Sequence, residues 1–533
     1  MTRAAPSPPP CGEGVAATRL GEGLPTPHSA REDPSPSPAS IEGDTGGATL
    51  SPQGREGFLR LSANAIPLPQ GGGEIRTVAV IDTGKTNAKV ALVAAEDGAE
   101  LALRTDANAV RAEGPYPHFD VARLWAFLCD SLAALNREAP VDAISITAHG
   151  SAGAFISCDP EGDGLALPIL DYEFEGPDEL AAEYDAVRPA FAETFSPRLP
   201  GGLNLGAQIF WQARRFPDAV EAAAFYVNYP QYWAWRLSGV AATEMCSMGA
   251  HSDLWDPRRL AWSSLVGRMG WDKKFAPLRS AFDRLGPVRA EVARRLGLDP
   301  ATPVLCGIHD SSASLLPHLK ARRPPFTVVS TGTWVILFAA GGDIEKLDPA
   351  RDTLANVSAF GEPVPCGRFM GGREFERLTE GEKAAPSDSD LDRVIREKIM
   401  ALPTFAPGVG PFPHGKGRWS AEPATLSPGE RTAAASLYLA LVTAESIRAA
   451  GGSGPVIVEG PFAANRIFCG ALSAIAGTPV EPSERSAGTT LGATLLAAGK
   501  APRRAAAQAA ITPLSHPGLA AYAEMWRRAA EAG

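Results

Sequence analysis

Carboxylate, hydroxyl, amide and ammonium groups are concentrated in one short stretch, Asp82-Thr83-Gly84-Lys85-Thr86-Asn87-Ala88-Lys89. Gly84 lets backbone N–H groups come close to an anion, and the polar side chains around it can complete a phosphate site. Asp82 then remains free to hold Mg²⁺, mostly through water molecules. The residues predicted to bind the phosphates of a nucleotide here are Thr83, Gly84, Thr86, Asn87 and Lys89.

The flanking residues predict that this stretch is the turn of a β-hairpin. Apolar, often β-branched residues fill 78–81 and 90–93, and such runs on both sides of a polar turn are typical of paired strands. A P-loop would need glycine where the chain has Ala79, and a helix where it has residues 90–93. An ordinary hairpin with a polar turn remains the alternative to a phosphate site.

A second stretch, residues 327–338, repeats this pattern of strand, Ser/Thr/Gly turn and strand. Two such hairpins predict two domains of related design, each offering a turn to one phosphate chain across a cleft. The repetition favours a protein that handles nucleotides. In the second turn, the residues predicted to bind phosphate are Thr331, Gly332 and Thr333.

Asp310 follows a short apolar run and opens a Ser/Ala-rich segment, so residues 304–315 predict a strand, a turn and a helix. A carboxylate at a helix N-terminus is stabilised in its ionised form. It can act as a general base or simply cap the helix, since Asp is a favoured N-cap residue. Both interpretations stay open from the residues alone.

Two further side chains are candidates for contact with a substrate. His149 follows the predicted buried strand 141–147, and ligands collect at the carboxyl ends of such strands. Glu173 follows the apolar run 167–170, although surface carboxylates are common. Residues 210–255 are rich in Trp, Tyr and Phe, which could stack on sugar faces but more often form a packed core.

Composition narrows the class of protein. The chain has 533 residues, 45% hydrophobic and 21% charged, which predicts a soluble globular protein of two or three domains. A net charge of −10 argues against nucleic acid or an anionic membrane as a partner, and no apolar run is long enough for a membrane span. The seven scattered cysteines favour buried free thiols and a cytoplasmic location. Residues 1–74, rich in Pro, Gly and Ser, predict a disordered extension.

The order of these motifs resembles that of the FGGY carbohydrate kinase family, within the actin-like ATPase superfamily. The resemblance spans roughly residues 78–499, and one departure is Pro461, where the family usually has a second glycine at the adenosine turn. The matching motifs are residues 82–89, 307–313, 330–333, 459–465 and 490–493.

The resemblance implies an α/β fold of two actin-like (ribonuclease H-like) domains with an interdomain cleft. The expected divisions are an N-terminal kinase domain at 75–318, a C-terminal kinase domain at 319–505 and a helical tail at 506–533. It also implies transfer of the γ-phosphoryl group of ATP to a hydroxyl of a ketose or polyol, for which we expect a sugar like L-rhamnulose or L-fuculose.

The same resemblance assigns roles to residues. Asp310 would be the general base, Asp82 would hold Mg²⁺, and the adenosine site would include Gly460 and Asn465. His149 and Glu173 would contact the sugar. The alternatives are a catalytically silent sugar-binding regulator and an actin-like ATPase that needs no sugar. A homodimer is compatible with the sequence, which does not define the oligomeric state.

Overall fold

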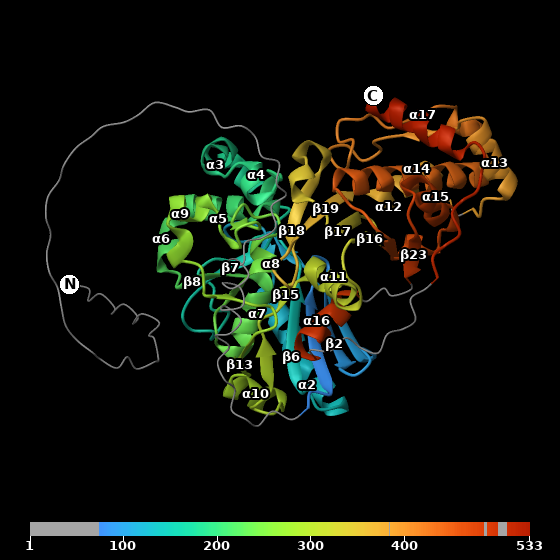
Figure 1. The fold of residues 1–533 in the computed structure, drawn as a ribbon. Coiled ribbons are helices and arrows are strands. Elements are labelled where there is room, and N and C mark those ends of the chain that lie inside the picture. The colour runs from blue at the N-terminus through green and yellow to red at the C-terminus, as the bar shows by residue number, and fades with distance from the viewer. Residues whose placement is uncertain (1–73, 383, 484–487, 499–508, 533) are drawn as a thin grey trace, which may run out of the picture. The chain divides into compact units, whose positions relative to one another are not determined.

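The structure, a computed structural model, describes residues 74–382, 384–483, 488–498 and 509–532. The extension predicted at 1–74 therefore lies outside the described residues, except for its last residue. The described chain forms two mixed α/β units, each built on its own sheet, and this confirms the predicted fold class (Figure 1).

The first sheet holds the predicted phosphate hairpin at its centre. Strands β1 and β2 pair antiparallel, and β1 pairs parallel with β6 on its other side. Both faces are covered, which explains why the central residues 78–81 of β1 are all apolar and buried. The sheet order is β13 (Arg284–Pro287), β14 (Pro303–Leu305), β6 (Ala143–Ala148), β1 (Thr77–Thr83), β2 (Asn87–Ala94) and β3 (Glu100–Ala107), with β15 (Ile308–His309) also on β6.

Helix α2 (Val121–Glu138) covers one face of this sheet with the helical stripe expected from the sequence. Helix α16 (Gly488–Ala498) covers the other face, where the Ser145 hydroxyl donates to the Ala493 carbonyl at 2.7 Å. Figure 1 shows α16 beside β6, although its residues follow the second sheet along the chain. A helix that follows the second sheet along the chain is thus packed against the first sheet.

The second sheet repeats the hairpin design. Strands β16 and β17 pair antiparallel, and β16 pairs parallel with β22, as β1 does with β6. The order is β18 (Thr353–Val357), β19 (Pro363–Phe369), β17 (Val335–Ala340), β16 (Phe326–Thr331), β22 (Val456–Glu459) and β23 (Val480–Ser483). One core joins it to α12 (Gly371–Thr379), α13 (Asp388–Arg396), α14 (Pro428–Ala449), α15 (Arg466–Ala476) and α17 (Leu519–Glu531).

The start of the long helix α14 is encoded by capping rather than by apolar spacing. Ser427 accepts from the Glu430 backbone N–H, Glu430 accepts from the Ser427 N–H, and Pro428 occupies the first helical position. Such a capping box satisfies two amide groups that would otherwise lack partners. The expected helix near 465–476 is confirmed as α15.

Helix α11 (Asp310–Ala321) lies against α16. A Cβ atom on Gly492 would lie 1.8 Å from the Ala313 carbonyl oxygen, so only glycine allows this approach. Gly492 therefore serves the packing of α16 against α11. This position also lies in residues 490–493, which the resemblance places at an adenosine site.

The aromatic stretch is a packed core. Helix α7 (Tyr229–Ser238) buries Tyr229, Tyr232, Trp233 and Trp235 completely or almost so. A sugar-stacking platform on these rings is therefore wrong. Other elements of this region are β7 (Gly153–Ile156), α5 (Leu205–Arg215), β8 (Phe225–Asn228) and α8 (Met245–Met248).

Five cysteines are free and buried, as expected: Cys129, Cys246, Cys306, Cys366 and Cys469. Cys158 is disulfide-bonded, so the expectation of free thiols is wrong for this residue. Cys11 lies outside the described residues. Among the helices of the described ranges, none is long and apolar enough to cross a membrane.

Candidate active site

Strand β6 brings the two key carboxylates together. Asp82 at the end of β1 is paired with Thr147 of β6, and His309 of β15 is paired with Ala148, the next residue. Asp310 follows His309 directly and begins α11. Two motifs that are far apart in the sequence therefore end at the same edge of one sheet, where ligands collect in α/β folds.

The charge of Asp310 acts on Asp82. Burial, as the largest cause, and the nearby charge of Asp310 together raise the pKa of Asp82 to about 7, against the charge of Lys89, which lowers it. Lys89 lies directly opposite Asp82 in the β1–β2 pair. Burial also raises the pKa of Asp310 to about 6, against hydrogen bonds from Ser311 that lower it. A third of the Asp310 side chain is still exposed, so a substrate can reach it.

Asp310 does not cap its helix. The N-cap residue of α11 is His309, and Asp310 is the first helical residue. Its Oδ1 atom lies 3.2 Å from the Ser311 hydroxyl and 3.2 Å from His309 Nε2. The capping interpretation is therefore wrong, and the carboxylate is available for other contacts.

His149 is buried, and its ring is partly satisfied. Nδ1 lies 2.8 Å from the Gly150 carbonyl, which can only accept, so Nδ1 carries the proton. Burial, as the largest cause, and the charge of Lys85 contribute to a pKa of about 4 for His149, so the ring is neutral at neutral pH. Nε2 is then an acceptor, and it is buried without a hydrogen-bond partner among the described residues. A ligand hydroxyl is the type of donor that would satisfy it.

Glu173 contacts Lys85, and the residue before it, Tyr172, contacts His149. Its side chain is 66% exposed, and its carboxylate is 3.3 Å from the ammonium of Lys85. The ring of Tyr172, the preceding residue, packs edge-on against His149 at 5.2 Å between centroids. Glu173 and His149, the two residues expected to contact a sugar, therefore have neighbouring contacts at Lys85 and Tyr172. The structure thus adds Lys85 and Tyr172, which sequence reasoning missed although Lys85 lies within the first motif.

The first turn is closed by a backbone hydrogen bond, and its polar side chains range from fully buried to exposed. The Gly84 N–H donates to the Asn87 carbonyl at 2.9 Å, which closes the turn. Thr86 and Asn87 are exposed, and the Asn87 amide donates to the Thr86 hydroxyl at 3.1 Å. Thr83 is fully buried, and its hydroxyl has no partner among the described residues.

Hydrogen bonds and close packing hold the second turn against the neighbouring segment at residues 459–462. The Thr331 hydroxyl donates to the Glu459 carbonyl and accepts from the Phe462 N–H at 3.1 Å. A Cβ atom on Gly460 would lie 2.0 Å from the Thr331 carbonyl oxygen. Gly332 is partly exposed and Thr333 is exposed. The second turn and the expected adenosine turn are therefore in direct contact.

Asn465 and Gly372 each make hydrogen bonds that fix the start of a helix near the second turn. Asn465 caps α15 by accepting from the Phe468 N–H, and its amide donates to Ser436. The Gly372 N–H donates to the Thr333 carbonyl at 3.2 Å, so the start of α12 lies against the second turn. Sequence reasoning gave no role to residues 369–374, although the paired glycines there mark a close approach of two backbones.

The residues near Asp82 fit a hydrated magnesium ion better than a protein-only metal site. Within the described ranges, no group of three or more His, Cys, Asp and Glu side chains could hold a metal ion. Mg²⁺ usually keeps several waters and binds through one or two carboxylates plus substrate phosphates. Asp82 fits that mode, because burial and Asp310 leave its carboxylate short of positive charge.

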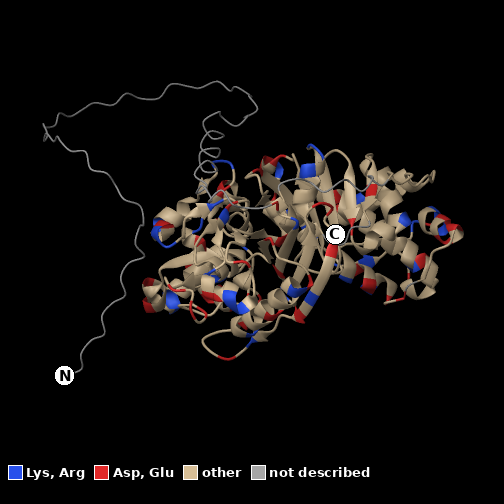
Figure 2. Ribbon diagram, turned by 90° about the horizontal axis from the view of Figure 1, so that it is seen from below, with Lys and Arg blue, Asp and Glu red and all other residues tan. Residues whose placement is uncertain are grey.

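Charges of both signs are interspersed over the described chain (Figure 2), so local ion pairs determine the electrostatics of the site.

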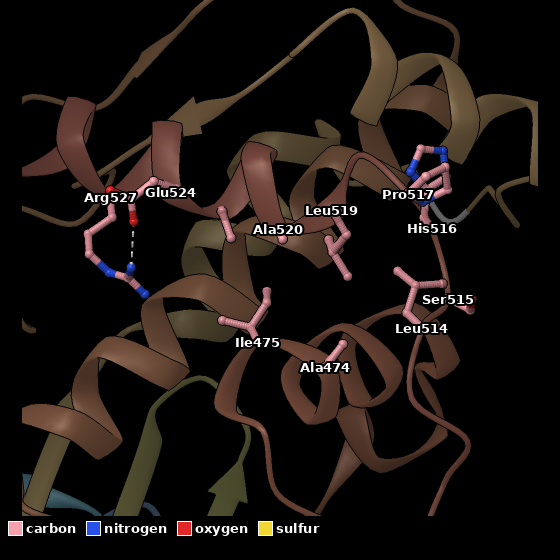
Figure 3. Close-up of a pocket in the computed structure, with 11 residues that line it drawn as sticks. Ala474, Ile475, Leu514, Ser515, His516, Pro517, Leu519, Ala520, Glu524 and Arg527 are labelled. Atoms are coloured by element: carbon pink, nitrogen blue, oxygen red, sulfur yellow. Dashed lines mark hydrogen bonds and ion pairs between the residues drawn. The ribbon is translucent and has the colours of Figure 1, made fainter.

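A separate hollow of about 560 Å³ lies between α15 and α17 (Figure 3). Ile475, Leu514 and Leu519 line it together with Arg527, which pairs with Glu524. No residue expected to bind nucleotide, sugar or metal lines this hollow.

Comparison with known proteins identifies the class and then the family. The architecture is that of two-domain carbohydrate kinases of the actin-like ATPase fold: a solved carbohydrate kinase from Novosphingobium aromaticivorans is 35% identical, with a TM-score of 0.79 over 86% of this chain and 100% of that one. Residues 202–317 match the N-terminal domain of the FGGY family of carbohydrate kinases, and residues 323–506 match the C-terminal domain of carbohydrate kinase FGGY. The chain belongs to the FGGY family.

More distant relatives are named for different sugars. L-fuculokinase from Salmonella typhi is 25% identical over 284 residues, which cover 50% of this chain and 57% of that protein. This chain thus spans little more than half the length of that relative. A ligand-bound xylulose kinase from Lactobacillus acidophilus is 14% identical, with a TM-score of 0.70 over 86% of this chain and 97% of that one, and it shows the fold alone.

Proposed function

We propose that this protein transfers the γ-phosphoryl group of ATP to a hydroxyl of a ketose or polyol, with Asp310 as the general base. The observation that carries the proposal is the placement of Asp310 and Asp82 at one sheet edge, where the charge of Asp310 is close enough to raise the pKa of Asp82. Phosphoryl transfer needs mainly in-line positioning and neutralisation of charge, and these groups are suited to both.

Asp310 would accept the proton of the sugar hydroxyl. A base works best when its pKa is near the operating pH and it is still mostly ionised there. The raised pKa of Asp310, about 6, meets both conditions. The neighbouring His309 ring would fix the carboxylate through its 3.2 Å contact.

Asp82 would hold Mg²⁺ through water, and when bound the ion would neutralise the charge of the nucleotide phosphates. The first turn, including Thr86, Asn87 and Lys89, would contact the same phosphates. The second turn, with Gly332 and Thr333, would hold the phosphate chain from the other side, next to the adenosine turn at Gly460. Asn465 would act there by fixing the start of α15.

The acceptor would be an uncharged sugar whose hydroxyl donates to His149 Nε2 and whose other hydroxyls bond to Glu173. The neutral, unsatisfied His149 ring supports this proposal. A deoxy-ketohexose such as L-fuculose or L-rhamnulose is our choice of substrate, supported by the likeness to L-fuculokinases over half of the chain.

The test is ADP release from Mg²⁺-ATP across a panel of ketoses, aldoses and polyols. We expect one group of sugars to stimulate release, and Asp310→Asn to reduce the stimulated rate about 10²–10⁴-fold. Asp97→Asn, in the exposed turn between β2 and β3, is the matched control and should retain full activity. Release that no sugar stimulates would favour the actin-like ATPase, and sugar binding without release would favour the regulator.

A further inference from the structure

Lys85 connects the first turn to residues expected at the sugar site. It lies between Gly84 and Thr86, but its ammonium points toward the segment that carries Asp171 and Glu173. It is hydrogen-bonded to the Asp171 carboxylate and lies 3.3 Å from that of Glu173. The Lys85 side chain is only 17% exposed, so this ion pair is partly shielded from solvent.

Aromatic rings complete the surroundings of this ammonium. It lies 4.9 Å from the centroid of Tyr172 and 5.4 Å from that of Phe119, both within cation–π range. The same two rings pack on His149, at 5.2 and 5.0 Å between centroids. Lys85 therefore shares its immediate neighbours with His149 and contacts Glu173 directly.

Both ends of the connection are anchored in the backbone. On one side, the Asn108 amide donates to the Gly84 carbonyl at 2.8 Å, and its backbone N–H donates to the Thr86 carbonyl at 2.8 Å. On the other side, the Asp171 N–H donates to the Pro117 carbonyl at 3.0 Å. One ammonium group therefore joins two well-held segments.

We propose that Lys85 is a positioning residue for the acceptor sugar, a role that rests on the proposed kinase function. Its ammonium balances the adjacent carboxylates of Asp171 and Glu173 and holds Glu173 beside His149. It thereby fixes the sugar-binding segment relative to the turn that holds the transferred phosphate. Without it, repulsion between the two carboxylates would move Glu173 away.

The first test is the effect of Lys85→Met on the two Michaelis constants. This change keeps the apolar stem and removes the charge. We expect the KM for the stimulating sugar to rise about 10- to 100-fold, because small displacements of a positioned reactant have effects of that size. The KM for ATP should change less than about 2-fold, and Lys85→Arg should recover part of the sugar affinity, since it restores the charge.

Lys89→Met is the matched comparison, because Lys89 belongs to the same hairpin but lies opposite Asp82 and is exposed. Its loss should act on the KM for ATP rather than on the KM for sugar. If Lys85→Met raises the KM for ATP and leaves that for sugar unchanged, Lys85 is a phosphate ligand and our inference is wrong.

A second measurement separates this inference from the proposed function. Lys85→Met, Asp171→Asn and the double variant form a cycle in the free energy of unfolding, which needs no substrate. Coupled residues in contact give non-additive effects, and we expect the double variant to lose less stability than the sum of the single variants. Additive losses would overturn the connection. If the cycle shows coupling but no sugar stimulates ADP release, it is the kinase proposal that fails.

Discussion

The two hairpin turns have the same topology and very different contents. Each follows a strand that pairs antiparallel with the next strand and parallel with a strand behind it, β6 or β22. The first turn and its strand ends carry Asp82, Lys85 and Lys89, whereas residues 330–334 carry no charged side chain. The first turn contacts its surroundings through the ion pairs of Lys85 as well as through hydrogen bonds from Asn108. The second turn does so through hydrogen bonds of Thr331 and close backbone packing.

The difference suits the same hairpin topology to two tasks: binding of charged groups in the first turn and placement of the nucleotide in the second. Charged groups are able to bind metal and phosphate and to order a substrate, but they keep some exposure because burying a charge is costly. A turn such as Thr331–Gly332–Thr333 can instead be packed tightly against Gly460 and Gly372. We infer that the first turn contributes most of the chemistry and the second mainly places the nucleotide.

The largest expected difference between the turns is in catalysis. Asp82→Asn should reduce sugar-stimulated ADP release about 10²-fold or more, because it removes the carboxylate expected to hold Mg²⁺. Thr333→Ala, in the second turn, should reduce it less than about 10-fold, since backbone N–H groups remain there to bind phosphate. Steady-state rates of both variants at saturating ATP test this. Equal losses would show that the two turns do not divide the work as we infer.

The second prediction concerns packing at the second turn. Gly460 has φ +82° and ψ −165°, a conformation that is essentially restricted to glycine, and an added Cβ would lie 2.0 Å from the Thr331 carbonyl oxygen. Gly460→Ala should therefore lower the free energy of unfolding by about 2–4 kcal/mol and raise the KM for ATP.

Gly477→Ala is the control for this prediction. Gly477 also has a positive φ, +65°, but nothing lies within 4 Å of an added Cβ. Its substitution should cost only the strain of a left-handed residue, about 1–2 kcal/mol. Denaturant unfolding of the two variants measures the difference. The same loss in both would mean that the contact with Thr331 does not constrain the turn.

The smallest expected effect is a pH dependence confined to the first turn. The pKa of Asp82 is raised from 3.8 to about 7 on folding, so its ionisation opposes folding. Its contribution to stability is present below about pH 4 and is lost as the pH rises through about 7. In a chelating buffer, wild type should lose thermal stability relative to Asp82→Asn over this range, by on the order of 1–3 °C.

Thr333→Ala provides the reference for this measurement, because the substitution removes no titratable group. Its melting temperature should follow that of wild type in parallel at every pH. If wild type and Asp82→Asn also run parallel, then Asp82 titrates normally in the folded protein, and the first turn is less shielded than its surroundings indicate.

Local pattern was sufficient to predict the main elements of both sheets. The hairpins at β1–β2 and β16–β17, the helix α2 and the strand before Asp310 all have apolar spacing that depends only on near neighbours. These features follow from preferences of a few adjacent residues.

The sequence by itself therefore determined the two hairpins and the order of the motifs, and it singled out Asp82 and Asp310 as candidate site residues. Only the tertiary structure decided that Lys85 pairs with Asp171, 86 residues away, and that α16 returns to the first sheet to meet α11. It also decided that His309, and not Asp310, occupies the N-cap position of α11, and that the aromatic stretch is core. The physical reason is that local propensities act over a few residues, whereas ion pairs, helix packing and burial depend on which distant segments share one sheet.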